Sequence, residues 1–233
     1  MRYTKELAFH VKRIEGILVV GEQKVFSELA QIVDIALEAN TILNTMFKMG
    51  HDESQLTEAL HSIQELQKRG ADAAFRCTED ITGGAVSPNV IDDLLRFSQS
   101  ESEIVHTSLH IGRELARMAR AYAAGLEMHD ANWDSVFENM LALVRESLLK
   151  LKQALSSSDV SEIIRLGKEV RVLEEQGDDV KDQGFDRLYG IAPQLNYLEF
   201  FHYQRLLHTC EDTLNTCGEC GELLVSVVTS ILK

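Results

Sequence analysis

The chain has 233 residues, a formal net charge of −14 and an isoelectric point near 5.0. This excess of acid excludes a broad nucleic-acid surface, which needs clustered Lys and Arg, and it argues against electrostatic docking on anionic lipid. Hydrophobic residues make up 45% and charged residues 26% of the chain, as is usual in a globular protein. With only two prolines, the composition favours long uninterrupted helices.

The N-terminus does not resemble a secretory signal, because its apolar run, Ile17–Val20, is too short. The longest apolar-rich stretch, Leu223–Leu232, is about half of the ~20 residues that a helix needs to span a bilayer. We therefore expect a cytoplasmic protein. Its four cysteines are expected to be reduced thiols or metal ligands rather than disulfides.

The hydrophobic patterning predicts an all-α chain of six long antiparallel helices, with no convincing strand. Their predicted bounds are about Glu22–Lys48, Ser54–Ile81, Ser87–Gly125, Asn132–Leu155, Asp159–Tyr189 and Asn196 to the C-terminus. Gly83 and Gly84 are expected to form a turn. Ser87 is a suitable N-cap because Pro88 follows it at the first helical position. Asp159 is expected to cap the fifth helix in the same way.

Heptad seams run along the third, fifth and sixth segments, as in helices that pack at shallow angles. The clearest seam is Tyr203, Leu207, Cys210, Leu214, Cys217, Gly221, Leu224, Val228 and Ile231. In the third segment Glu101 and Ser108 interrupt the seam. A buried glutamate needs a partner or a proton, so Glu101 is either paired in the core or near enough to a helix end to reach water.

A weak internal repeat relates the two halves of the chain. Gly70 in ELQKRGADAAF and Gly177 in VLEEQGDDVKD lie at similar places in the second and fifth segments. The simplest architecture is a single domain, residues 1–233, made of two tandem three-helix bundles. The repeats would cover approximately residues 17–128 and 132–233.

The stretch LEEQGDDVKDQGFDRLYG, followed by NYLEFFHYQRLLHTCEDTLNTCGECGELL, resembles the PhoU-like regulators of phosphate transport. It is most similar to the stand-alone branch of that family linked with phosphate permeases. The family shows Leu-Glu-x-x-x-Asp on one helix, then a Pro-Leu-Asp-Phe-like lead-in and Glu-Asp-x-x-Asp-x-x-Glu-Asp on the next. Here these motifs fall on Leu173, Glu174 and Asp178, on Tyr197–Phe200, and on Glu211, Asp212, Asn215 and Glu219.

The resemblance implies a PhoU-like, non-enzymatic regulatory protein that modulates a phosphate permease or a related signalling protein through its helix faces. It would reach the membrane only through that partner, and the apolar end Leu223–Ile231 is one candidate contact face. The resemblance also implies a divalent metal or iron, with Glu174, Asp178 and Glu211 as ligands. Helical bundles of this kind commonly self-associate, so we expect a homodimer.

The chain departs from the family's metal motifs at several positions. Asn215 stands where the family has aspartate, and in the first half the corresponding positions are Gln67 and Ala71, then Ser102 and His106. Carboxylates such as those of the second half suit Mg, Mn, Ca or Fe. The alternative is a solvated acidic strip in which Lys181 pairs with Asp178.

Two further clusters of possible metal ligands have simpler interpretations. Cys217 and Cys220, with Cys210 upstream, could bind metal or act in redox chemistry, but their place in the middle of a helix favours packing in the core. His106 and His110 have a spacing that can chelate a metal, although they share a face with Arg113 that is expected to meet solvent.

Two other functions compete with the regulator. A metal store or carboxylate-metal enzyme on a helical bundle would need Glu-x-x-His pairs facing inward from several helices. Glu103/His106 has that spacing on a face expected to point outward, and Glu199/His202 has it near a helix start. A structural coiled-coil adaptor would share the heptads, but it would not explain the positions of the acidic motifs.

Overall fold

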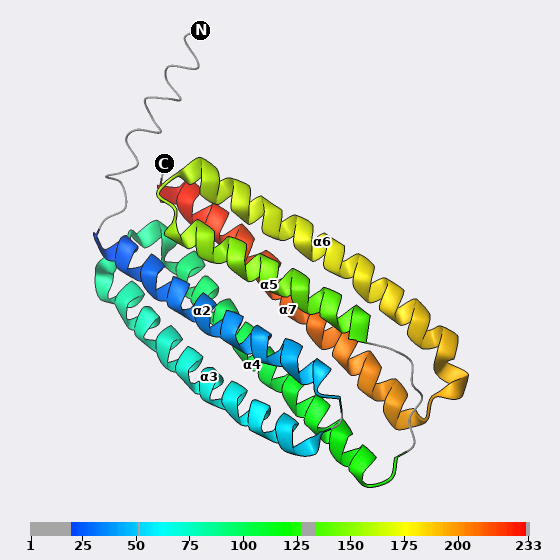
Figure 1. Cartoon of the computed structure of the whole chain (residues 1–233). Coiled ribbons are helices and arrows are strands. Elements are labelled where there is room, and N and C mark those ends of the chain that lie inside the picture. Colours follow the sequence, from blue (N-terminus) through cyan, green and yellow to red (C-terminus); the bar gives the residue numbers. More distant parts are fainter. Residues whose placement is uncertain (1–19, 51, 127–133, 232–233) are drawn as a thin grey trace.

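The computed structural model describes residues 20–50, 52–126 and 134–231. In these residues all regular structure is helical, and Figure 1 shows the long helices lying lengthwise beside one another. They are α2 (Val20–Lys48), α3 (Glu53–Asp80), α4 (Ile91–Ala123), α5 (Asp134–Ser156), α6 (Val160–Ile191) and α7 (Tyr197–Ile231). The predicted all-α class is confirmed, and most predicted helix ends agree within a few residues. The predicted helix start at Asn132 lies outside the described residues.

The six helices form two three-helix bundles that lie side by side. Helices α2, α3 and α4 pack on one another, as do α5, α6 and α7. The bundles meet where α2 packs on α5 and α4 packs on α7, which leaves α3 and α6 at opposite edges (Figure 1). Two buried clusters, one containing Phe97 and Leu224 and the other Ile63 and Leu207, each draw side chains from both bundles. The bundles therefore share their core.

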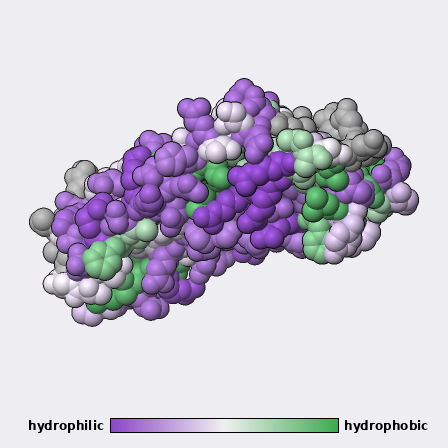
Figure 2. Space-filling model, turned by 90° about the horizontal axis from the view of Figure 1, so that it is seen from below, coloured by the Kyte–Doolittle hydropathy of each residue, from purple (hydrophilic) through white to green (hydrophobic). Residues whose placement is uncertain are grey.

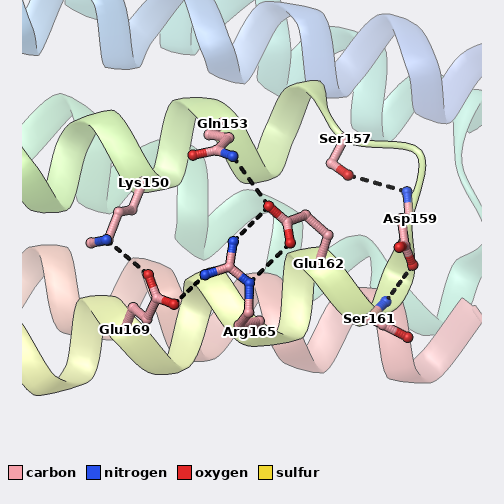
Figure 3. Close-up of polar contacts among 8 residues, drawn as sticks. All are labelled: Lys150, Gln153, Ser157, Asp159, Ser161, Glu162, Arg165 and Glu169. Atoms are coloured by element: carbon pink, nitrogen blue, oxygen red, sulfur yellow. Dashed lines mark hydrogen bonds and ion pairs between the residues drawn. The ribbon is translucent and has the colours of Figure 1, made fainter.

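Side chains at the helix ends hold the connections in place. Asp159 caps α6 as predicted, because its Oδ1 accepts a 2.9 Å hydrogen bond from the backbone N–H of Ser161 (Figure 3). Before α7, Asn196 and Glu199 form a reciprocal capping box with hydrogen bonds of 2.9 and 3.0 Å. Gly125 adopts φ 97° after α4, where its N–H donates to Tyr122, as in a Schellman motif.

The link between α3 and α4 differs from the prediction. A π-helical turn, Ile81–Ala85, continues α3, and a 3-10 turn, Pro88–Val90, comes before α4. Ser87 lies at the N-cap position of this 3-10 turn with Pro88 after it, as predicted. Its side chain does not cap the turn, because its hydroxyl donates a 2.9 Å hydrogen bond to Oε1 of Glu22 on α2. The link is therefore fixed by a contact between helices that the local sequence does not reveal.

Helices α6 and α7 approach each other closely through glycines. A Cβ at Gly167 would lie 2.8 Å from the carbonyl oxygen of Gly221, and a Cβ at Gly177 would clash with Cδ1 of Leu214. The predicted seams are confirmed, since nearly all of their members are buried. None of the described helices is both long enough and apolar enough to cross a membrane.

Candidate functional site

The three acidic residues expected to bind a metal lie on the paired helices α6 and α7, but a lysine lies among them. The Nζ of Lys181 is 2.8 Å from Oδ1 of Asp178 and 3.2 Å from Oε1 of Glu211. Asn215 donates a further hydrogen bond of 2.9 Å from Nδ2 to the same Glu211 oxygen. The structure thus brings Asp178 and Glu211 together around an ammonium group.

This ion pair is partly shielded from solvent. The side chains of Lys181 and Glu211 are 19% and 16% exposed, whereas Asp178 is 48% exposed. Hydrogen bonds to Asp178 and then Glu211 raise the pKa of Lys181, so its ammonium stays charged at neutral pH. Because it is partly buried, the bridge links α6 to α7 more firmly than an exposed pair would.

The third acidic residue, Glu174, lies about one turn before Asp178 on α6. Its side chain is 12% exposed, and its Oε2 is 3.3 Å from Nε of Arg171. It packs over Gly218 of α7, where an added Cβ would lie 3.4 Å from Cβ of Glu174. Burial raises the pKa of Glu174 and the charge of Asp178 adds to this, while Arg171 opposes it. Glu174 therefore does not share the lysine with the other two carboxylates.

As arranged, these side chains fit an ion-pair bridge and do not fit a metal centre. In the part of the chain that the structure describes, no three or more His, Cys, Asp or Glu side chains are grouped so that they could hold a metal ion. A cation between Asp178 and Glu211 would have to displace the ammonium of Lys181. Metal ligation by Glu174, Asp178 and Glu211 stays a prediction, and it would require Lys181 to move away.

The cysteines lie in the hydrophobic core. Cys210, Cys217 and Cys220 are fully buried, and Cys77 on α3 is buried as well. Burial raises the pKa of the Cys210 thiol to about 12 and those of the other two α7 thiols well above their ordinary value. Thiols in this state are poor nucleophiles and poor metal ligands, which agrees with packing in the core.

Glu101 is the most unusual polar residue of the core. It is 0% exposed on α4, beside Cys217 and Cys220, and neither of its carboxyl oxygens has a hydrogen-bond partner of normal geometry among the described residues. Burial raises its pKa to about 8, although the Cys220 thiol opposes the shift slightly. At neutral pH the carboxyl is therefore protonated, the form that a core tolerates best.

The opposite side of α6 faces α5 and carries a structural network of charges. Figure 3 shows Arg165 lying between Glu162 and Glu169, and Lys150 reaching Glu169 from α5 at 2.8 Å. Gln153 donates a 3.1 Å hydrogen bond to Glu162. Each charged side chain drawn in Figure 3 therefore has a partner within the network. The network holds α5 against α6, and it offers no unpaired charge to a ligand.

Unpaired acids gather instead on the exposed face of α6. Asp179, Asp182 and Asp186 are exposed and make no hydrogen bond or ion pair with any described residue. Val172 lies two turns before Asp179 on the same helix and is 51% exposed. We call Asp179, Asp182 and Asp186 the acidic face of α6. It is a surface with negative charge and no partner within the described chain.

Apolar side chains are exposed chiefly at the α6–α7 turn. Tyr189, Tyr197, Leu198 and Phe201 are 65%, 78%, 46% and 49% exposed. Figure 2 shows a mostly hydrophilic face of the molecule, with hydrophobic areas gathered chiefly towards its two ends. The expectation that Leu223–Ile231 forms an exposed contact face is wrong for the most part, because most of its large side chains lie in the core between the bundles.

No family model matches the sequence, and no curated protein matches it either. Among solved structures, it is similar to a PhoU-like protein from Shewanella oneidensis MR-1, with 15% identity and a TM-score of 0.67 over 88% of this chain and 99% of that one. A second structure from the same organism, described as that of a PhoU-like phosphate regulatory protein, has 14% identity and a TM-score of 0.64 with the same coverage. The two bundles formed by the six long helices of the described residues, together with this coverage, show that the chain has the PhoU-like fold.

Proposed function

We propose that this chain is a non-enzymatic, cytoplasmic regulator of phosphate transport that acts by binding a phosphate permease or a related signalling protein. The observation that carries the proposal is the fold, shared over 99% of a protein described as PhoU-like and phosphate-regulatory. The order of acidic motifs on α6 and α7 supports it. At this level of identity the fold is the shared property, and the function is proposed by analogy with that protein.

A binding role agrees with the chemistry of the described groups. Lys181 neutralises the carboxylates that could otherwise hold a cation, and the α7 thiols are protonated and buried. Glu101 has a raised pKa that would suit an acid catalyst, but it lies in the core without access to a substrate. These residues therefore support the fold rather than a reaction.

We assign the contact with the partner to the acidic face of α6. Cytoplasmic loops of membrane proteins are enriched in Lys and Arg, so a permease offers basic segments on that side of the membrane. Unpaired carboxylates on a rigid helix complement such segments without first breaking an internal ion pair. On this proposal the protein reaches the membrane through the permease, and its own negative charge keeps it from anionic lipid.

The test is phosphate uptake in cells that lack the protein, measured with scarce and with abundant phosphate. We expect uptake or phosphate accumulation to change in at least one condition, and the intact gene to restore it. Unchanged uptake in both conditions would contradict the proposed function.

A further inference from the structure

Two histidine side chains on α4 lie in close contact with each other, and neither the fold nor the proposed function explains this contact. His106 and His110 are one helical turn apart, their ring centroids are 4.6 Å apart and their ring planes meet at 83°. Their Nε2 atoms are 2.9 Å apart and share a hydrogen bond, in which the tautomers decide which nitrogen donates. A metal ion bound by both nitrogens would replace this shared proton. His106 is half-buried and His110 is exposed, so the two nitrogens are held by the helix but remain open to solvent.

We propose that His106 and His110 form a two-nitrogen chelate for a late first-row divalent cation, Cu²⁺ or Ni²⁺. Bonds of about 2.0–2.1 Å from one metal to two nitrogens 2.9 Å apart enclose an angle of roughly 90°. A tetrahedral ion such as Zn²⁺ would place the nitrogens about 3.3 Å apart at the same bond length. A right angle instead matches two neighbouring positions of a tetragonal or octahedral ion, the geometry of Cu²⁺ and Ni²⁺.

Two arginines and a glutamate lie near the histidine pair. Burial lowers the pKa of His110, and His106, Arg113 and Arg205 lower it further, while Glu103 opposes them. Arg113 comes from α4 itself and Arg205 from the neighbouring α7.

The two arginines also influence which further ligands the metal ion would bind. The guanidinium groups of Arg113 and Arg205 repel a dication but attract an anion, so water or an anionic co-ligand would fill the positions that two nitrogens leave open. Two protein ligands and exposed positions describe an exchangeable site rather than a structural one. The site lies on α4, apart from the acidic face of α6, and does not depend on the proposed function.

The test is titration of the full-length protein with Ni²⁺ in a calorimeter at pH 7.5. The variants are His106→Gln and His110→Gln, with His208→Gln as the matched control, since His208 is an exposed histidine on α7. Losing a residue that merely supports a metal ligand costs about 10–100-fold in affinity, and losing one of two ligands should cost at least that much. We expect this loss in both α4 variants and none in the control.

A spectroscopic measurement identifies the ligands independently of affinity. The electron paramagnetic resonance spectrum of bound Cu²⁺ should show two equatorial nitrogens in the wild type and in His208→Gln, and fewer in either α4 variant. Circular dichroism checks that all variants are folded. Equal Ni²⁺ affinity and stoichiometry in His106→Gln, His110→Gln and His208→Gln would overturn the proposal, as would an unchanged nitrogen signal.

Discussion

Lys181 on α6 donates a hydrogen bond of 3.2 Å from Nζ to Oε1 of Glu211 on α7. The lysine thereby lies where two carboxylates would otherwise face each other across the helix pair. A positive side chain at this place does electrostatically what a cation would do, because it compensates the negative charges and links the two helices. This single contact decides how the acidic motifs are interpreted.

Replacement of Lys181 by glutamine should therefore expose a latent cation site. Without the ammonium, Asp178 and Glu211 repel each other, and we expect unfolding to become easier by on the order of 1 kcal/mol. The same repulsion should increase the affinity for Mn²⁺, which carboxylate oxygens suit. Calorimetric titration with Mn²⁺ and chemical denaturation measure the two effects.

The matched control for this variant is Lys68→Gln. Lys68 makes a 2.7 Å ion pair with Glu65 on α3, but both side chains are more than half exposed. This change should alter neither Mn²⁺ binding nor stability by a measurable amount. If Lys181→Gln binds Mn²⁺ no better than Lys68→Gln does, the idea of a latent site is wrong.

Two helix glycines should respond oppositely to alanine. A Cβ at Gly167 would meet the backbone oxygen of Gly221 at 2.8 Å, so α6 and α7 would have to separate, at a cost of about 1–3 kcal/mol. At Gly70 the nearest atom is Cγ2 of Val105 at 3.6 Å, which is ordinary contact. Gly70→Ala should therefore be neutral or stabilise the protein by up to about 1 kcal/mol, since alanine is the better helix former.

Urea denaturation of the two alanine variants measures this difference. Equal changes in the free energy of unfolding for Gly167→Ala and Gly70→Ala would contradict the close packing of α6 on α7 at Gly167.

The buried carboxyl of Glu101 should make stability depend on pH. Its pKa rises from 4.5 to about 8 on folding, so between these values the folded state holds a proton that the unfolded state has lost. The stabilisation is complete below about pH 4.5 and is lost as the pH rises towards 8, by up to about 1.4 kcal/mol per pH unit. Glu101→Gln should flatten this slope.

Denaturation of the wild type and Glu101→Gln at pH 5, 6, 7 and 8 provides the measurement. The control is Glu175→Gln, because Glu175 is exposed on α6 and should leave the slope as it is in the wild type. Parallel curves for the wild type and Glu101→Gln would mean that Glu101 reaches solvent or a partner.

The fold was largely predictable because local and global signals agree. The seams, the Asp159 cap and the breaks between helices all follow from side-chain periodicity and capping chemistry, which depend on neighbouring residues. The role of Ser87 was not predictable in this way, because its partner Glu22 is distant in the sequence. The burial of Leu223–Ile231 likewise depends on how the second bundle packs on the first.

The candidate site was only partly predictable. Helical spacing placed Glu174 beside Asp178, and the neighbouring seams placed Glu211 near both. Helical spacing did not reveal that Lys181 would reach across to Glu211, because a long side chain can point along either of two helix faces. The facing nitrogens of His106 and His110 follow from rotamers, which residue spacing permits but does not fix.

On our proposal, the acidic face of α6 binds the partner through which the protein regulates phosphate uptake. The most direct measurement is phosphate uptake in cells that lack the protein and receive either Asp179→Asn/Asp182→Asn or Asp72→Asn/Glu79→Gln. Both double variants remove two exposed acids without internal partners, the first pair from α6 and the second from α3. We predict that the α3 variant restores wild-type uptake and the α6 variant does not. Full restoration by the α6 variant, or equal failure of both, would contradict the account.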